Sequence, residues 1–142
     1  MTYASVQDMV TRFGAVEMLR LSVADGSLPD AGAPLPTLRI EQAIADASRL
    51  IETHLRVRYT VPVTPPPDDL VRCACVLARY DLATGGDREP SEQMRLARKE
   101  VLAWLTQLSR GEVSLEGAVL ISAGAGARTA DRPPMFLSRG GL

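Results

Sequence analysis

The residues able to perform chemistry in this 142-residue sequence are few and are poorly grouped for catalysis. His54 is the single histidine and lies two residues after Glu52, so on a helix the two side chains diverge and cannot share a metal ion as a Glu-x-x-His pair would. Cys73 and Cys75 are also two residues apart on a predicted helix, which favours neither a disulfide nor a common metal site. We interpret His54 as a helix-surface or hydrogen-bonded core histidine, and both cysteines as core thiols.

Acidic side chains offer two further possibilities for chemistry. Asp68 and Asp69 have the look of paired catalytic carboxylates, but adjacent acids at a helix start are better explained by capping and by the field of the helix N-terminus. Asp25 and Asp30 suggest a calcium loop, yet Pro29 breaks the alternation of ligands that such a loop requires. Phosphate-binding glycine loops and nucleophile elbows are also missing from the sequence. We therefore predict no catalytic, metal or cofactor site, and we expect a binding protein, not an enzyme.

Composition narrows the class of protein further. With 142 residues, of which 46% are hydrophobic, the chain is predicted to form one globular domain with a real core. Lys and Arg total 16 and Asp and Glu total 17, and this net charge of -1 argues against a dedicated nucleic-acid-binding protein. No apolar run approaches the roughly 18 residues of a membrane span, and the N-terminus lacks the pattern of a signal peptide. We expect a protein that is made in the cytosol and does not bind a membrane.

The elements that must position these side chains are predicted to be helices, and the longest runs from Leu38 to Tyr59. Its apolar residues recur every three or four positions and form one face, and its charged residues form the other. Thr37 is the predicted N-cap, and the Val61-Pro62 pair is expected to end the element. We predict an all-α fold, a small helical bundle around this one long central helix, with a long loop and an extended C-terminal tail.

A helical hairpin is predicted before the central helix. Ser5 and Asp8 match a capping box that opens a short helix, and Gly14 interrupts it before a second short segment from Ala15 to Leu21. Residues 22–36 follow as a long surface loop, because their glycines and prolines break both helix and strand periods.

Two more helices are predicted after the central one. The first runs from about Leu70 to Ala83, with Asp68 or Asp69 as its cap, and the second lies between Ser91 and Gly111. Trp104 is the only tryptophan and is interpreted as an aromatic core anchor. The predicted core residues are Phe13, Ile44, Ile51, Leu55, Tyr59, Leu77, Tyr80, Trp104 and Leu105.

The end of the chain differs in character, so we divide the chain into a helical domain at residues 1–115 and an interaction tail at residues 116–142. Val119, Leu120 and Ile121 are consistent with a short strand. A solvated tail has no reason to carry further apolar residues, whereas a tethered segment buries them in a partner's groove. The predicted partner-binding residues are Arg132, Met135, Phe136, Leu137, Arg139 and Leu142. The alternative is a frayed terminus that packs loosely on its own bundle.

The order of several short motifs resembles a family of small proteins of Mu-like phages and prophages, found among the head and tail morphogenesis products. The motifs are D-M-V-T-R-F-G at 8–14, A-I-A-D-A-S-R-L-I-E-T-H-L at 43–55, R-Y-T-V-P-V at 58–63 and A-R-Y-D-L at 78–82. They cover about residues 1–115 and carry no catalytic signature.

This resemblance implies a structural virion protein, a head-to-tail adaptor or connector that forms a ring beneath the portal. The implied partners are the portal protein, a downstream connector or tail protein, and copies of the same chain in a dodecamer through which viral DNA passes without sequence-specific binding. The implied location is the head-tail interface of the virion, after assembly in the host cytoplasm.

The residues leave one alternative of another class open, a small helical regulator that binds nucleic acid or protein through the N-terminal hairpin. Glu17 and Arg20 are the main polar side chains of the would-be recognition segment, which favours packing over base readout. A regulator would usually be a dimer, whereas an adaptor would be a monomer that forms a ring on its portal.

Overall fold

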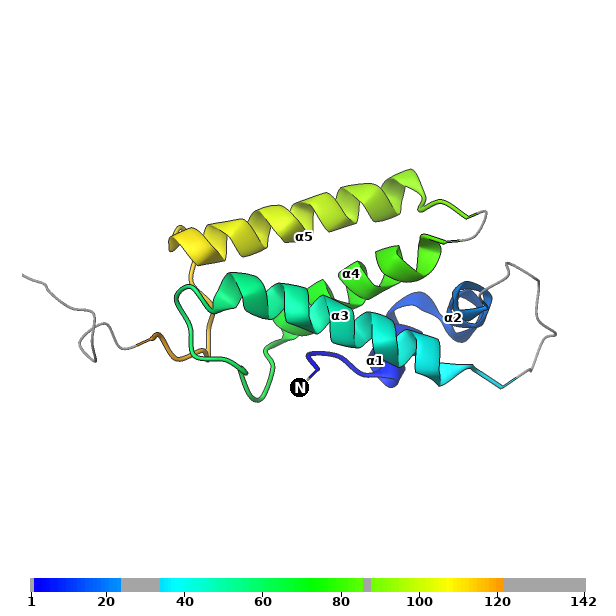
Figure 1. Ribbon diagram of the computed structural model, residues 1–142, viewed down its shortest axis with the longest axis horizontal. Coiled ribbons are helices and arrows are strands. Elements are labelled where there is room, and N and C mark those ends of the chain that lie inside the picture. The colour runs from blue at the N-terminus through cyan, green and yellow to red at the C-terminus, as the bar shows by residue number, and fades with distance from the viewer. Residues whose placement is uncertain (1, 24–33, 86–87, 122–142) are drawn as a thin grey trace, which may run out of the picture.

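The computed structural model describes residues 2–23, 34–85 and 88–121 (Figure 1). Its helices are α1 (Val6–Phe13), α2 (Ala15–Ser22), α3 (Thr37–Leu55), α4 (Asp68–Ala83) and α5 (Glu92–Arg110). In these described ranges, β-structure is limited to isolated bridges. The prediction of an all-α fold is therefore confirmed.

Helices α3, α4 and α5 form the long axis of the bundle, and the α1–α2 hairpin packs on α3 and α4 on the side away from α5 (Figure 1). Both α3 and α4 contact every other helix. The side chains of Leu70, Cys73 and Ala74 on α4 are fully buried, so α4 lies at least as deep as α3. The long helix α3 thus shares the centre of the bundle with α4.

Several helix boundaries follow from local sequence. The Ser5 hydroxyl accepts from the Asp8 N–H, and the Asp8 carboxylate accepts from the Ser5 N–H, so the predicted capping box is present. Ser91 caps α5 by accepting from the Met94 N–H. Gly111 ends α5 in the left-handed conformation, with φ of 78°, which only glycine adopts without strain.

Two predicted caps are wrong. Pro36, not Thr37, precedes the first turn of α3, and Pro67, not Asp68 or Asp69, precedes that of α4. A proline cannot donate a hydrogen bond but its carbonyl still accepts, and the Pro67 carbonyl receives the N–H groups of the first turn of α4. The two aspartates therefore lie inside the first turn, where their charge favours the helix dipole.

Most predicted core positions are buried, and three are not fully so. The buried ones are Ile44, Ile51, Leu55, Tyr59, Leu77 and Leu105. Phe13, Tyr80 and Trp104 are only partly buried, which corrects the prediction. The outer faces of the first two rings are covered by guanidinium groups, that of Arg79 at 4.4 Å from the Phe13 centroid and that of Arg98 at 4.7 Å from the Tyr80 centroid.

Trp104 lies at the edge of the buried stripe of α5, whose centre is formed by Val101, Leu105 and Leu108. We expect Leu105→Ala to lower the free energy of unfolding by about 2 to 5 kcal/mol, the range for a fully buried leucine. Trp104→Ala should cost less than its neighbour, because part of the indole is exposed to water in the folded state, whereas Leu105 is fully buried. Urea denaturation of the two variants checks this order, and a larger loss for Trp104→Ala would contradict it.

The chain after α5 stays against the bundle as far as Ile121. Leu115 is buried, and its N–H donates to the Tyr59 hydroxyl at 3.1 Å. The six predicted partner-binding residues, from Arg132 to Leu142, lie outside the described residues. The division at residue 115 stays a prediction, and residues 116–121 of the predicted tail lie beside the helical body.

Candidate functional site

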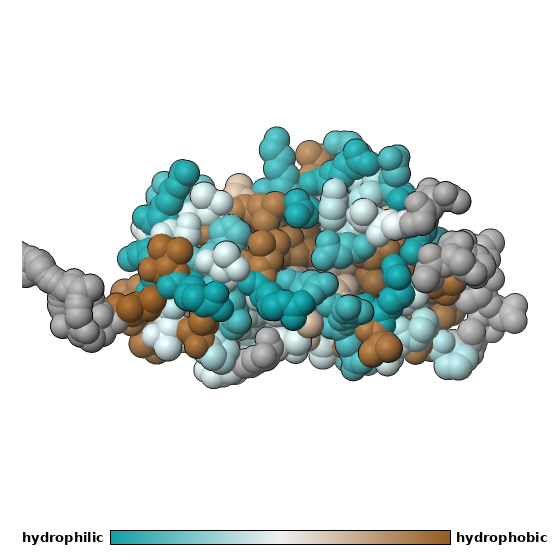
Figure 2. All heavy atoms as spheres, in the orientation of Figure 1, coloured by the Kyte–Doolittle hydropathy of each residue, from teal (hydrophilic) through white to brown (hydrophobic). Residues whose placement is uncertain are grey.

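One end of the molecule carries an apolar surface. Just past the C-terminus of α3, Tyr59 and Leu120 form an antiparallel bridge, flanked by hydrogen bonds from the Thr60 N–H to the Val119 carbonyl (2.7 Å) and from the Ile121 N–H to the Arg58 carbonyl (2.8 Å). Beside this bridge, Val57, Val119, Leu120 and Ile121 are 64%, 68%, 53% and 47% exposed. We call these four residues the apolar end, and Figure 2 shows hydrophobic surface gathered at the left-hand end of the molecule.

Exposed aliphatic side chains contribute little to the core, so a cluster of them is a candidate binding surface. Among the residues that the structure describes, the other large exposed apolar side chains are Val16, Leu38 and Leu96, which lie on three different helices. The sequence predicted a short strand at residues 119–121, and the structure has a single bridge there, but no local pattern indicated that its partner would be Tyr59.

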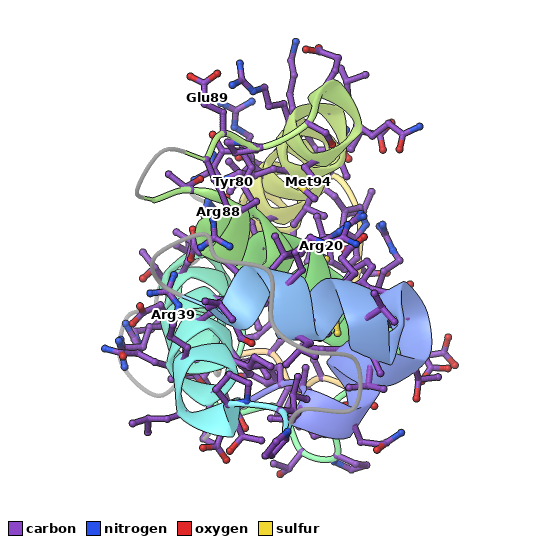
Figure 3. All side chains as sticks on the ribbon, turned by 90° about the vertical axis from the view of Figure 1, so that its right-hand side faces the viewer. Arg20, Arg39, Tyr80, Arg88, Glu89 and Met94 are labelled. Carbon is purple, nitrogen blue, oxygen red and sulfur yellow. The ribbon has the colours of Figure 1, made fainter. Side chains whose placement is uncertain are left out.

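The opposite end of the molecule is rich in arginine. Arg20, Arg39 and Arg88 come from α2, α3 and the α4–α5 connection, and they face the viewer in Figure 3. The Arg88 Nη1 donates to the Arg20 carbonyl at 3.0 Å, while its Nε and Nη2 are buried without a hydrogen-bond partner in the part of the chain that the structure describes. We call these three residues together with Arg98 the arginine end.

A pocket of about 620 Å³ opens at this end, lined by residues that include Tyr80, Arg88, Glu89 and Arg95. Guanidinium groups are the preferred protein ligands of carboxylates and phosphates, so the chemistry of this end suits an acidic group. Burial raises the pKa of the nearby Asp81, and the charge of Arg98 opposes that shift. The arginines are far apart in the sequence, which is why sequence reasoning did not group them.

Between the two ends, Tyr3 connects three segments of the chain. The Tyr3 side chain is fully buried, and its N–H donates to Ser48 Oγ at 2.9 Å. Its hydroxyl donates to a Glu52 carboxylate oxygen at 2.8 Å and accepts from the Val63 N–H at 3.2 Å. This one side chain therefore holds the N-terminus and the proline-rich connection after α3 against the same face of α3.

The buried acids of the core predict a loss of stability in alkali. Burial, with a smaller effect of the Glu52 carboxylate, raises the pKa of Tyr3 from 10.0 to about 12. Burial likewise raises the pKa of Cys73 and of Cys75 from 9.0 to about 11. A raised pKa means that the unfolded chain loses the proton first, so the stability these groups contribute is complete below pH 9 and is lost as the pH rises to about 12.

We expect the melting temperature to fall steeply between pH 9 and about pH 12. Lys99 is the single lysine of the chain, so lysine deprotonation adds little to this profile. Thermal denaturation at stepwise increasing pH checks the prediction, with Cys73→Ala/Cys75→Ala as the control that removes the lower part of the transition. A melting temperature that stays constant to pH 12 would contradict it.

His54, Cys73 and Cys75 lie on α3 and α4. His54 Nδ1 lies 3.1 Å from the Leu50 carbonyl of its own helix, and Cys73 and Cys75 are buried free thiols. In the ranges 2–23, 34–85 and 88–121, no three His, Cys, Asp or Glu residues gather to hold a metal ion. Of the described helices, none combines the length and apolar character that crossing a membrane requires.

The N-terminal hairpin uses its polar residues for packing. Glu17 on α2 accepts two hydrogen bonds from Arg79 on α4, at 2.6 and 3.0 Å, and this guanidinium also stacks on Phe13 of α1. A recognition helix needs its polar side chains free to reach a partner. The contacts of α2 therefore give no support to the regulator alternative.

Comparison with known proteins relates the chain to proteins of Mu-like phages. The model of the family described as "Bacteriophage Mu, Gp36" matches residues 3–129. Gene product J of Escherichia phage Mu is 34% identical over 115 residues, which cover 79% of this chain and 74% of that protein. The Mu-like prophage FluMu protein gp36 of Haemophilus influenzae is 27% identical over 113 residues, covering 80% and 74%. The chain thus belongs to the bacteriophage Mu Gp36 family, as a protein of the Mu-like phages and prophages.

Proposed function

We propose that this protein is a structural component of the virion, a head-to-tail adaptor that forms a ring between the portal and the tail components. The observation that carries the proposal is the presence of two chemically different surfaces, the apolar end and the arginine end, at opposite ends of one helical body (Figure 1). A connector must bind a different neighbour on each side. Membership of a phage family supplies the context for this role.

We further propose that copies of the chain form the ring through a head-to-tail contact. A surface that binds a different surface on the next copy makes a head-to-tail contact, and such contacts close into rings when the rotation between copies allows it. We propose the portal, a downstream connector or tail protein, and further copies of the chain as partners. The role needs no cofactor and no catalysis, only interfaces.

The C-terminal segment is proposed to make one of these contacts. Met135, Phe136, Leu137 and Leu142 supply apolar anchors, and Arg132 and Arg139 flank them for pairing with acidic groups of the partner. Pro133 and Pro134 stiffen the approach, so that fewer conformations are lost on docking.

A nonsense mutation in the gene, in an inducible prophage, tests the proposal. Loss of an adaptor should leave DNA-filled heads and separate tails that do not join, visible by electron microscopy of the induced lysate. Supplying the protein from a plasmid should restore joining. Lysates that contain joined particles, or that contain neither heads nor tails, would contradict the adaptor role, and the second result would indicate a regulator.

A further inference from the structure

The segment at residues 119–121, which pairs with Tyr59 through a single bridge, has one closed edge and one open edge. The two flanking hydrogen bonds make Tyr59 and Leu120 a pair of the non-hydrogen-bonded type, in which the N–H and C=O of each residue point away from the other strand. The outward N–H of Tyr59 is satisfied, because it donates to the Leu55 carbonyl at 2.7 Å. The N–H of Leu120 has no backbone acceptor among the residues described, so its edge is open to a third strand.

The side chains beside this open edge require an apolar occupant. Val119, Leu120 and Ile121 are about half or more exposed, and Val57 extends the same surface. A strand added to the edge of Leu120 would satisfy its backbone and would cover these side chains with its own. The occupant must therefore be an extended segment of about three apolar residues.

The chain itself supplies such a segment. Residues 122–134 contain no apolar side chain larger than alanine apart from prolines, and Met135, Phe136 and Leu137 follow them. Pro133 and Pro134 favour an extended backbone at the start of this group. Because only residues 122–134 separate this group from Ile121, the group is tethered directly to the surface in question.

Residues 122–134 tether Met135–Leu137 to the open edge, and this tether favours the chain's own segment over that of a second copy as the occupant. Thirteen residues of a chain rich in glycine and small residues have a root-mean-square reach of about 20 Å, which exceeds the separation of two adjacent strands of about 5 Å. Short flexible linkers hold their ends at effective concentrations in the millimolar range. The segment of a second copy, present at micromolar concentration, therefore competes poorly with the chain's own tethered segment for this edge.

We infer that in the free protein Met135–Leu137 adds to residues 119–121 as an antiparallel strand of the same chain, with Phe136 opposite Leu120, and covers the apolar end. Alternation places Met135 beside Ile121 and Leu137 beside Val119 on one face, with Phe136 beside Leu120 on the other. The segment is then stored on its own body until a partner takes it up. This inference concerns the free chain and does not depend on the adaptor role.

Disulfide trapping in the full chain tests the inference. In the inferred strand, Leu120 and Phe136 form a hydrogen-bonded antiparallel pair, because the N–H and C=O of Leu120 point toward the added strand. The Cα atoms of such a pair are about 5.5 Å apart, which is within the range that a disulfide bridges. The variant Leu120→Cys/Phe136→Cys is oxidised with glutathione disulfide in dilute solution, and products are identified by non-reducing electrophoresis and mass spectrometry. Cys73 and Cys75 are buried, and the two single variants control for their participation.

The matched control is Leu120→Cys/Ala130→Cys, whose shorter loop closes at least as fast in a random chain. We expect an intramolecular disulfide that forms about tenfold faster in Leu120→Cys/Phe136→Cys than in Leu120→Cys/Ala130→Cys. Only in the first variant does docking raise the effective concentration of one thiol near the other above the value that the tether alone gives. Replacing Met135 and Leu137 with serine should abolish that advantage. Equal rates for the two pairs, or crosslinked dimers as the main product, would overturn the inference.

Discussion

Replacing Tyr3 with alanine should lower the free energy of unfolding by about 3 to 5 kcal/mol, the range for removing a large buried aromatic side chain. Tyr3 is fully buried, and its hydroxyl bridges Glu52 on α3 and the Val63 N–H of the proline-rich connection. The variant therefore leaves a cavity and two polar groups without their partner. Urea denaturation followed by circular dichroism at 222 nm measures the loss.

Tyr3→Phe is the matched control, because it keeps the ring and removes only the hydroxyl. It should cost about 1 to 3 kcal/mol, the penalty for buried groups left without a hydrogen bond. Glu52→Gln keeps an acceptor for the hydroxyl and should cost less than Tyr3→Phe. If Tyr3→Ala lost less than about 1 kcal/mol, the N-terminus would not be held as the structure has it.

Deleting residues 129–142 should weaken binding to the portal about a hundredfold while lowering the free energy of unfolding by only about 1 to 2 kcal/mol, the stability that docking of Met135–Leu137 on the apolar end contributes. The segment removed contains the apolar group from Met135 to Leu137, and the helical core described here ends before it. Binding by surface plasmon resonance and stability by urea denaturation give the two values on the same preparation.

A full-length variant with Met135, Phe136 and Leu137 replaced by serine separates the apolar anchors from the length and charge of the tail. It should lose as much binding as the truncation, because buried apolar anchors dominate the energy of such interfaces. An Arg132→Ala/Arg139→Ala variant should lose less. Unchanged binding by the truncated protein would show that the tail does not contact the portal.

Features fixed by neighbouring residues could be predicted from the sequence. The Ser5–Asp8 capping box, the Ser91 cap and the end of α5 at Gly111 each depend on contacts within one turn, and all are present. The caps at Thr37 and Asp68 were wrong because polar residues matched the usual preference, while in the structure a proline precedes the first turn of each helix, and the Pro67 carbonyl accepts the first N–H groups of α4.

Features fixed by residues far apart in the sequence could not be predicted in the same way. Tyr3 contacts Glu52 and Val63, and Tyr59 pairs with Leu120, so each depends on how whole helices are placed. The partial exposure of Tyr80 arises from the same cause, since its cover is Arg98 of another helix. Helical periodicity identifies which face of a helix is apolar, but it does not show how much of that face a neighbouring helix covers.

The measurement that tests the adaptor role most directly is electron microscopy of the purified protein mixed with the portal of the same phage. The adaptor role predicts a closed ring of this protein bound to one end of the portal, with density for the C-terminal segment on a portal subunit or on an adjacent copy. A chain that stays unbound at concentrations well above the micromolar range, or that binds as isolated dimers, would contradict it.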